Sequence, residues 1–226
     1  MITPTLPRRR PGRPPRLDPQ GQDARERLLR AGLELLTERA FHSVGLEELL
    51  GRADVPRGSF YHYFASKDDF GLEAVDAYGR YFAARLDRRL LAPGRSPLDR
   101  LADFVADAEA GMARYGFRRG CLIGNLGQEM GGLADDFRLR IEAVFQDWEA
   151  RLADCLSAAV AAGQLAPETD CPRWAHLFWI GWEGAVLRAR LVRNGAPLRL
   201  FFETFLAALP RPPSFPAEET PCSTPS

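Results

Sequence analysis

The sequence predicts an all-α protein of about nine helices. Apolar residues recur at helical spacing through most of the 226-residue chain, with neither the two-residue alternation of an amphipathic strand nor a hairpin turn. The 18 prolines fall in the two end segments or where a helical pattern starts or stops, as expected for a residue without a backbone N–H. Hydrophobic residues make up 46% of the chain and charged residues 27%, which indicates a globular protein.

Three helices are expected near the N-terminus. The stripe formed by Leu28, Ala31 and Leu35 predicts the first helix, and shorter patterns predict helices at about 46–52 and 57–63. A tight break that contains a proline separates the two short helices. Two short helices joined by such a turn form a helix-turn-helix.

The rest of the chain predicts longer helices. Apolar stripes run through residues 98–112 and, over about six turns, through residues 137–159. Residues 174–192 are apolar on most sides, which predicts burial on both faces. The apolar residues of 201–209 predict a last helix that closes the fold.

Both ends of the chain are expected to be disordered because they are rich in proline. Residues 210–226 form a Pro-rich tail, and residues 1–21 form a basic arm. The first 17 residues hold five arginines and no acid, although the net charge of the whole chain is zero. This arm can lie in a narrow minor groove of DNA, or it can be a solvated segment with non-specific attraction to a polyanion.

The second short helix has the composition of a DNA-recognition helix. Phe60 and Phe64, four residues apart, can anchor one face, which leaves polar and aromatic side chains to contact base edges and phosphates. Lys67, the only lysine, follows Ser66 at the start of the next helix, where backbone N–H groups favour a phosphate. Two core-packing helices with a polar surface are the alternative. The candidate DNA-binding residues are Arg57, Gly58, Ser59, Tyr61, His62, Tyr63 and Lys67.

The string VPRGSFYHYF at residues 55–64, followed by Ser-Lys at 66–67, makes residues 24–70 resemble the DNA-binding domain of the TetR family of bacterial repressors. The helix-turn-helix itself is expected at about 45–64. One position departs from the family pattern. Gly45 stands where a Thr or Ser often caps the first helix of the motif, and glycine is an acceptable cap that offers no hydroxyl to a phosphate.

The family resemblance implies the organisation of the whole chain. Residues 22–82 would form the DNA-binding domain, and residues 83–209 a ligand-binding and dimerisation domain. The partners implied are double-stranded operator DNA, a small-molecule inducer and a second copy of the chain. Phe201, Phe202 and Phe205 offer more aromatic surface than a peripheral last helix needs, which fits burial against that second copy.

Residues 116–130 and 178–185 resemble a narrower branch of this family whose members respond to acrylate or to reactive electrophiles. That likeness implies a repressor that acrylate or a similar small unsaturated compound releases from its operator. A small carboxylate needs an apolar slot and a cationic or N–H partner. The candidate ligand-binding residues are Tyr115, Arg118, Cys121, Asn125, Trp179, Trp182 and Glu183.

Several of these candidates also have structural explanations. Trp179 and Trp182 stand at helical spacing, as core residues do, and Asn125 can serve as a helix-end partner. Glu183 is different, because a carboxylate in an apolar helix must be paired or protonated, which favours a site.

Cys121 supports an alternative mechanism, a covalent sensor of electrophiles or oxidants. It is expected in the first turn of a helix, just after Arg118 and Arg119, where the helix dipole and the arginines favour the thiolate. A small buried residue is the other interpretation. Cys155 and Cys171 lie in apolar patterns and are expected in the core. No CxxC pair or histidine spacing predicts a metal site.

Other classes of protein are less well supported. An all-α enzyme would need a catalytic or metal constellation that the sequence lacks, so we expect neither catalytic residues nor a cofactor. A protein-interaction module that uses the Pro-rich ends would bind its partner without Arg57 and Tyr61. No apolar run is long enough to cross a membrane, and no secretory signal opens the chain, which predicts a cytoplasmic protein.

Overall fold

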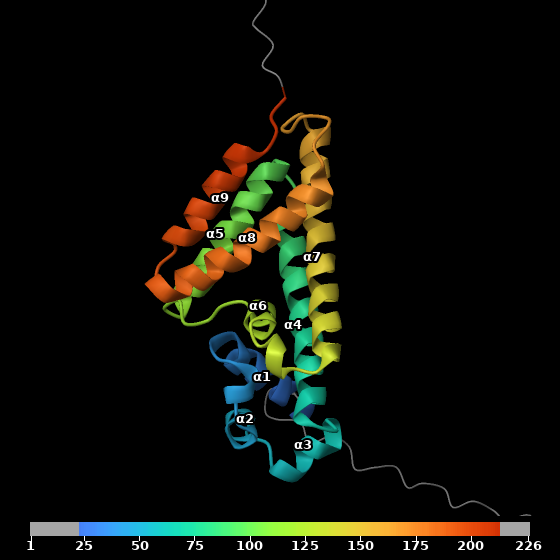
Figure 1. Cartoon of the computed structure of the whole chain (residues 1–226), viewed down its shortest axis with the longest axis vertical. Coiled ribbons are helices and arrows are strands. Elements are labelled where there is room, and N and C mark those ends of the chain that lie inside the picture. The colour runs from blue at the N-terminus through green and yellow to red at the C-terminus, as the bar shows by residue number, and fades with distance from the viewer. Residues whose placement is uncertain (1–22, 213–226) are drawn as a thin grey trace, which may run out of the picture.

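The computed structural model describes residues 23–212, which form nine α-helices, two short 3-10 helices and no strand (Figure 1). The all-α prediction is therefore confirmed. The predicted basic arm, residues 1–21, lies outside these residues, and so does the predicted tail apart from residues 210–212. The helices are α1 (Ala24–Glu38), α2 (Leu46–Ala53), α3 (Arg57–Tyr63), α4 (Lys67–Leu90), α5 (Pro97–Arg114), α6 (Leu122–Gly127), α7 (Asp135–Ala161), α8 (Cys171–Val192) and α9 (Ala196–Ala208), with 3-10 helices η1 (Phe41–Ser43) and η2 (Met130–Gly132).

The first three helices pack together at one end of the molecule, against the start of α4 (Figure 1). Asp23 caps α1 by accepting a hydrogen bond from the N–H of Glu26 at 2.8 Å. The C-cap of α2 is Asp54, which adopts the left-handed region with φ of 52° and turns the chain toward α3. The predicted helix-turn-helix is present, and Gly45 is the N-cap of α2 without a side-chain hydrogen bond.

Helix α4 connects the two ends of the molecule. It runs for 24 residues along α7, and its N-cap is Ser66, whose hydroxyl accepts a hydrogen bond from the N–H of Asp69. The expected domain boundary at 82–83 falls inside this helix, which continues through it without a break. A rigid element therefore joins the helix-turn-helix to the rest of the chain.

An aromatic cluster fills the core between α4, α5, α7, α8 and α9. Trp148 and Trp179 lie 5.1 Å apart between ring centroids, and Phe178 stacks on Trp182 at 5.6 Å. All four rings are almost completely buried, so the core-packing explanation for Trp179 and Trp182 holds. Each such ring contributes a large apolar area to the core.

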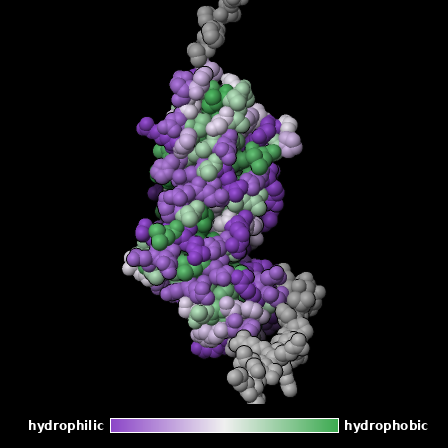
Figure 2. All heavy atoms as spheres, turned by 90° about the vertical axis from the view of Figure 1, so that its right-hand side faces the viewer, coloured by the Kyte–Doolittle hydropathy of each residue, from purple (hydrophilic) through white to green (hydrophobic). Residues whose placement is uncertain are grey.

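Helix α8 leaves an apolar face uncovered. Leu177, Ile180 and Leu191 are exposed there, and Leu200 of α9 is 67% exposed. The prediction that residues 174–192 are buried on both faces is thus wrong for a single chain. The side of the molecule formed by α7 is mostly hydrophilic (Figure 2).

The expectation for the aromatic residues of α9 also needs correction. Phe202 and Phe205 are buried within the chain itself, and Phe201 is half-buried against α8. Phe202 and Phe205 therefore belong to the core of one chain, and only Phe201 keeps part of its ring exposed. Among residues 23–212, no helix has the length and apolar character needed to span a membrane.

Candidate functional site

Helix α3 is held by one face and exposed on the other. Phe60 and Phe64 are 0% and 1% exposed, and their rings pack on each other and on Phe70 with centroids 5.1–5.8 Å apart. On the opposite face Tyr61 is 56% exposed. Arg57, Gly58 and His62 are also exposed, whereas Ser59 and Tyr63 are half-buried. No neighbour lies within 4 Å of the place where a side chain of Gly58 would begin.

Two of the predicted DNA contacts already have partners inside the protein. Arg57 pairs with Glu47 of α2 at 2.5 Å in an exposed ion pair, which DNA phosphates can replace. The ammonium of Lys67 donates to the carbonyl of Phe41 at 2.9 Å and lies 4.7 Å from the centre of its ring. Burial lowers the pKa of Lys67, although the charges of Asp68 and Glu129 oppose this. Lys67 thus fixes η1 beside α4.

The C-terminal end of α1 is capped by residues that lie far along the chain. The amide of Asn125 in α6 donates to the carbonyls of Leu36 and Thr37, at 2.9 and 3.2 Å. Arg190 of α8 donates both to the carbonyl of Glu38 at 2.8 Å and to the Asn125 side-chain oxygen at 2.7 Å. We call Asn125 and Arg190 the α1 clamp. The carbonyls at the end of a helix lack partners within that helix, and the clamp supplies them.

Asn125 is therefore a helix-end partner, as the alternative in the sequence analysis had it. Its oxygen and its amide both serve the clamp, so it has little hydrogen-bonding capacity left for a ligand.

A second link joins the segment after α6 to η1. The carboxylate of Glu129 accepts hydrogen bonds from the N–H groups of Phe41 and His42, and it lies 2.9 Å from the ring Nδ1 of His42. Burial alone would raise the pKa of Glu129, but the hydrogen bonds from His42 and Phe41 hold it below its usual range. Glu129 is therefore charged and fastens η1, which immediately precedes α2.

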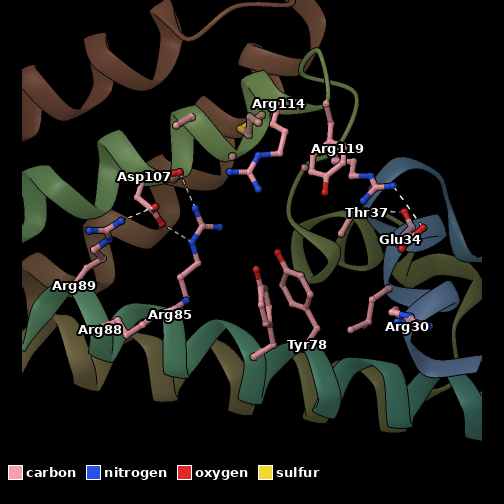
Figure 3. A pocket seen from close by; sticks show the side chains of 18 of the residues that line it. Arg30, Glu34, Thr37, Tyr78, Arg85, Arg88, Arg89, Asp107, Arg114 and Arg119 are labelled. Carbon is pink, nitrogen blue, oxygen red and sulfur yellow. Dashed lines mark hydrogen bonds and ion pairs between the residues drawn. The ribbon is translucent and has the colours of Figure 1, made fainter. Parts of the chain in front are cut away.

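A cavity of about 1070 Å³ lies between α1, α4, α5 and the segment 115–120 (Figure 3). Tyr115 lines it, as predicted for a ligand-binding residue, and the guanidinium of Arg119 stacks 4.0 Å from the Tyr115 ring. Arginine dominates the lining, with six arginines against three carboxylates: Arg30, Arg85, Arg88, Arg89, Arg114 and Arg119 against Glu26, Glu34 and Asp107. Such a lining attracts an anion.

The other predicted ligand-binding residues do not share this cavity. Arg118 lines a separate hollow of about 490 Å³ near α8. Trp179 and Trp182 lie in the aromatic core, and the buried Cys121 lies beside the half-buried Glu183. The sequence analysis instead missed most of the residues that line the large cavity. Arg85, Arg88 and Arg89 do stand at one-turn spacing on α4, but the sequence does not show what that face meets.

Cys121 does not have the environment that the sequence predicted. It is the N-cap of α6 and 8% exposed, and its sulfur accepts a hydrogen bond from the N–H of Gly124 at 3.5 Å. Burial and the neighbouring carboxylate of Glu183 raise the pKa of the thiol well above its usual range. The expected stabilisation of a thiolate by Arg118 and Arg119 is wrong, because Arg118 is exposed and Arg119 pairs with Glu38 of α1.

Glu183 is the carboxyl in an apolar helix that the sequence singled out. Part of the residue reaches the surface, but its Oε1 atom is buried and has no hydrogen-bond partner. Burial raises the pKa of Glu183 to about 7, and a hydrogen bond from the Cys121 thiol only partly offsets this. Burial, together with Cys121 and Glu183, likewise raises the pKa of Tyr78. Three titratable groups therefore share one buried space beside α6. Among residues 23–212, no three His, Cys, Asp or Glu side chains gather as a metal site would require.

Comparison with known proteins identifies the class. Residues 28–74 match the model of the bacterial regulatory proteins of the tetR family, and residues 97–205 match the model of the tetracyclin repressor-like C-terminal domain. The chain belongs to the TetR family of transcriptional regulators, which are DNA-binding proteins and not enzymes.

Individual relatives cover most of the chain. It is 52% identical over 202 residues to the transcriptional regulator AcuR of Cereibacter sphaeroides, covering 89% of this chain and 91% of that protein. It is 31% identical to the HTH-type transcriptional repressor NemR of Escherichia coli, covering 78% and 88%. A crystal structure of a regulatory protein TetR from Rhodobacter sphaeroides superposes with a TM-score of 0.80 at 52% identity, over 82% of this chain and 98% of that one.

Replacing Glu183 with glutamine should change how stability depends on pH. The native chain keeps the Glu183 proton up to about pH 7, whereas the unfolded chain loses it near the ordinary value of 4.5. Protons therefore bind more strongly to the native state, so the stability that this group contributes is lost as pH rises from about 4.5 to 7. The loss should total about 3 kcal/mol.

Urea unfolding between pH 4.5 and 8, at one fixed protomer concentration, measures this difference. Glu183→Gln should gain stability relative to the unmodified chain as pH rises through that window. Parallel pH profiles for the two proteins would contradict the assigned environment.

Proposed function

We propose that this TetR-family protein is a homodimeric repressor whose operator binding is controlled by a small ligand. The observation that carries the proposal is helix α3, whose aromatic anchors are buried while Arg57, Tyr61 and His62 project outward. The major groove of B-DNA admits an α-helix, so the hydrogen-bond donors and aromatic ring edges of α3 can contact the base edges there. Gly58 allows close approach of the backbone, and Ser59 and Tyr63 lie half-buried beside the exposed residues. We propose that it acts in the cytoplasm, where a regulator of this kind meets chromosomal DNA.

The exposed apolar face of α8 supports the homodimer. Leu177, Ile180 and Leu191 would otherwise remain in water, and Leu200 of α9 extends the same kind of surface. A two-fold interface there would present two α3 helices to one face of DNA. In the simplest helix-turn-helix geometry, such helices enter successive major grooves about 34–36 Å apart.

The α1 clamp supports a route from ligand to DNA. A ligand beside α5 and the 115–120 segment would move groups that are bonded directly to the end of α1, because the N–H of Gly120 donates to the Thr37 carbonyl at 2.9 Å. α1 in turn packs on both α2 and α3. The ligand must bind the two conformations unequally, and inverting a 1:99 population needs about 5.5 kcal/mol of difference.

Acrylate or a similar small unsaturated acid is the proposed ligand class. The resemblance to the acrylate- and electrophile-responsive branch carries this choice, and the arginine-lined cavity supports it, because a carboxylate needs a cationic partner. Tyr115 lines that cavity, while Arg118 lies at the separate hollow near α8. The alternative is a covalent electrophile or oxidant sensor acting through Cys121. Glu183, with a pKa near 7, is placed to take up the proton of that thiol.

Arg57→Ala should weaken operator binding at least about tenfold, because it removes a charged donor from the outward face of α3. Fluorescence anisotropy with DNA from the region upstream of the gene measures the dissociation constant. The slope of affinity against salt should also become shallower. The matched control is Arg138→Ala, an exposed arginine on α7 away from α3. An equal effect of the two substitutions would contradict the assigned DNA-binding face.

Acrylate should release the operator, and Cys121→Ser should leave that release unchanged if the ligand binds without a covalent bond. Serine keeps an N-cap for α6, so the variant should fold. The measurement is the anisotropy of labelled operator during titration with acrylate and, as a saturated control, propionate. Loss of the response only in Cys121→Ser would favour the covalent alternative, and indifference of the unmodified protein would remove acrylate as the ligand.

A further inference from the structure

The positive charge of the large cavity is concentrated at its α4–α5 end. Arg85, Arg88 and Arg89 come from α4 and Arg114 from α5, and Asp107 is the carboxylate of the lining that lies among them. Figure 3 shows Arg85 and Arg89 turned toward Asp107, while Arg114 reaches into the cavity.

Both carboxylate oxygens of Asp107 accept hydrogen bonds from two of these arginines. Arg85 and Arg89 each donate to one of its carboxylate oxygens at 2.8 Å, and Arg85 also donates to its backbone carbonyl. Burial would raise the pKa of Asp107, but the hydrogen bonds from Arg89 and Arg85 keep it below the usual value. Arg88 and Arg114 have no ion-pair partner within residues 23–212. The α4–α5 end of the cavity thus carries two positive charges without an acidic partner among the described residues, beside the two arginines that pair with Asp107.

Beside these arginines lies a surface suited to an organic group. Tyr78 rises from α4 into the cavity (Figure 3), and Tyr81, 55% exposed, lines it one turn further along α4. Ala108 and Met112 of α5 add apolar atoms to the lining. A flat or apolar part of a ligand can pack there while its anionic part meets the arginines.

The size of the cavity points to a larger molecule than acrylate. A volume of about 1070 Å³ lies just above the range of about 300–1000 Å³ typical of pockets for drug-sized ligands. A single small carboxylate would fill a minor part of it and neutralise one of the two uncompensated arginines. A phosphate carries more charge and more acceptor oxygens, and arginine binds it through two parallel hydrogen bonds.

We propose that this cavity binds an organic phosphate, with its phosphate groups at Arg88 and Arg114 and its organic part along Tyr78 and Tyr81. The inference rests on the ligand-controlled regulator proposed above, and it assigns this cavity a larger, phosphate-bearing ligand in place of the free acid. Coenzyme A is a carrier of acyl groups that bears phosphates. Its thioester with a small unsaturated acid would contain both the phosphates and the unsaturated acyl group. No residue of α3 lines the cavity, so operator DNA on α3 does not occupy it.

Isothermal titration calorimetry on the full chain tests the proposal with three probes: propionyl-coenzyme A, acrylate and inorganic pyrophosphate. The saturated thioester avoids addition of Cys121 to a double bond. It should bind at least about tenfold more tightly than acrylate and than pyrophosphate, since only the thioester engages both the arginines and the tyrosines. The double substitution Arg88→Gln and Arg114→Gln should weaken thioester binding at least about tenfold.

Arg138→Gln is the control, since it removes one exposed arginine from α7 outside the cavity and should leave thioester binding unchanged. The proposal is overturned if the thioester binds no more tightly than acrylate, if pyrophosphate alone binds as tightly, or if the double variant binds the thioester as the unmodified chain does. Operator affinity is measured separately by anisotropy. If the protein is not a DNA-binding regulator, the anisotropy will show no operator binding. If the cavity does not bind an organic phosphate, only the calorimetry will show it.

Discussion

The hydrogen bonds at the end of α1 hold the two parts of this molecule together. A helix leaves its last carbonyls without partners, and burying them unpaired costs about 1–3 kcal/mol each. Here Asn125 and Arg190 supply the missing donors from α6 and α8, and they also bond to each other. The position of α1 therefore depends on residues of the C-terminal helices.

The proposed response to a ligand follows from this dependence. Glu129 fastens η1 from the segment after α6, and α4 runs through both parts, so the C-terminal helices touch the helix-turn-helix region at several points. If α6 or α8 shifts while α1 stays in place, the carbonyls at the end of α1 lose these hydrogen-bond donors. In our account, the two conformations differ in this contact, and DNA and ligand each favour one of them.

The spacing of apolar residues and the positions of the prolines predicted the helices, including the recognition helix. These features depend only on residues close in sequence. The α1 clamp could not be predicted from the sequence, because Asn125 and Leu36 are 89 residues apart and only the fold brings them together. The pKa of the Cys121 thiol was wrongly predicted for the same reason. The adjacent Arg119 pairs with Glu38 of α1, while Glu183 of α8, distant in sequence, lies beside the thiol. Arg88 and Arg114 look like ordinary surface residues until α4 and α5 pack around one cavity.

The most direct test of the clamp is the operator affinity of Asn125→Ala, measured by anisotropy with and without acrylate. The recognition helix is untouched, so a change must reach it through α1. We predict that operator affinity changes at least about fivefold and that the acrylate effect shrinks. The control is Gln146→Ala, an exposed amide of α7 bonded only to Glu142 within its own helix. A folded Asn125→Ala protein with the operator affinity and acrylate response of this control would contradict the account.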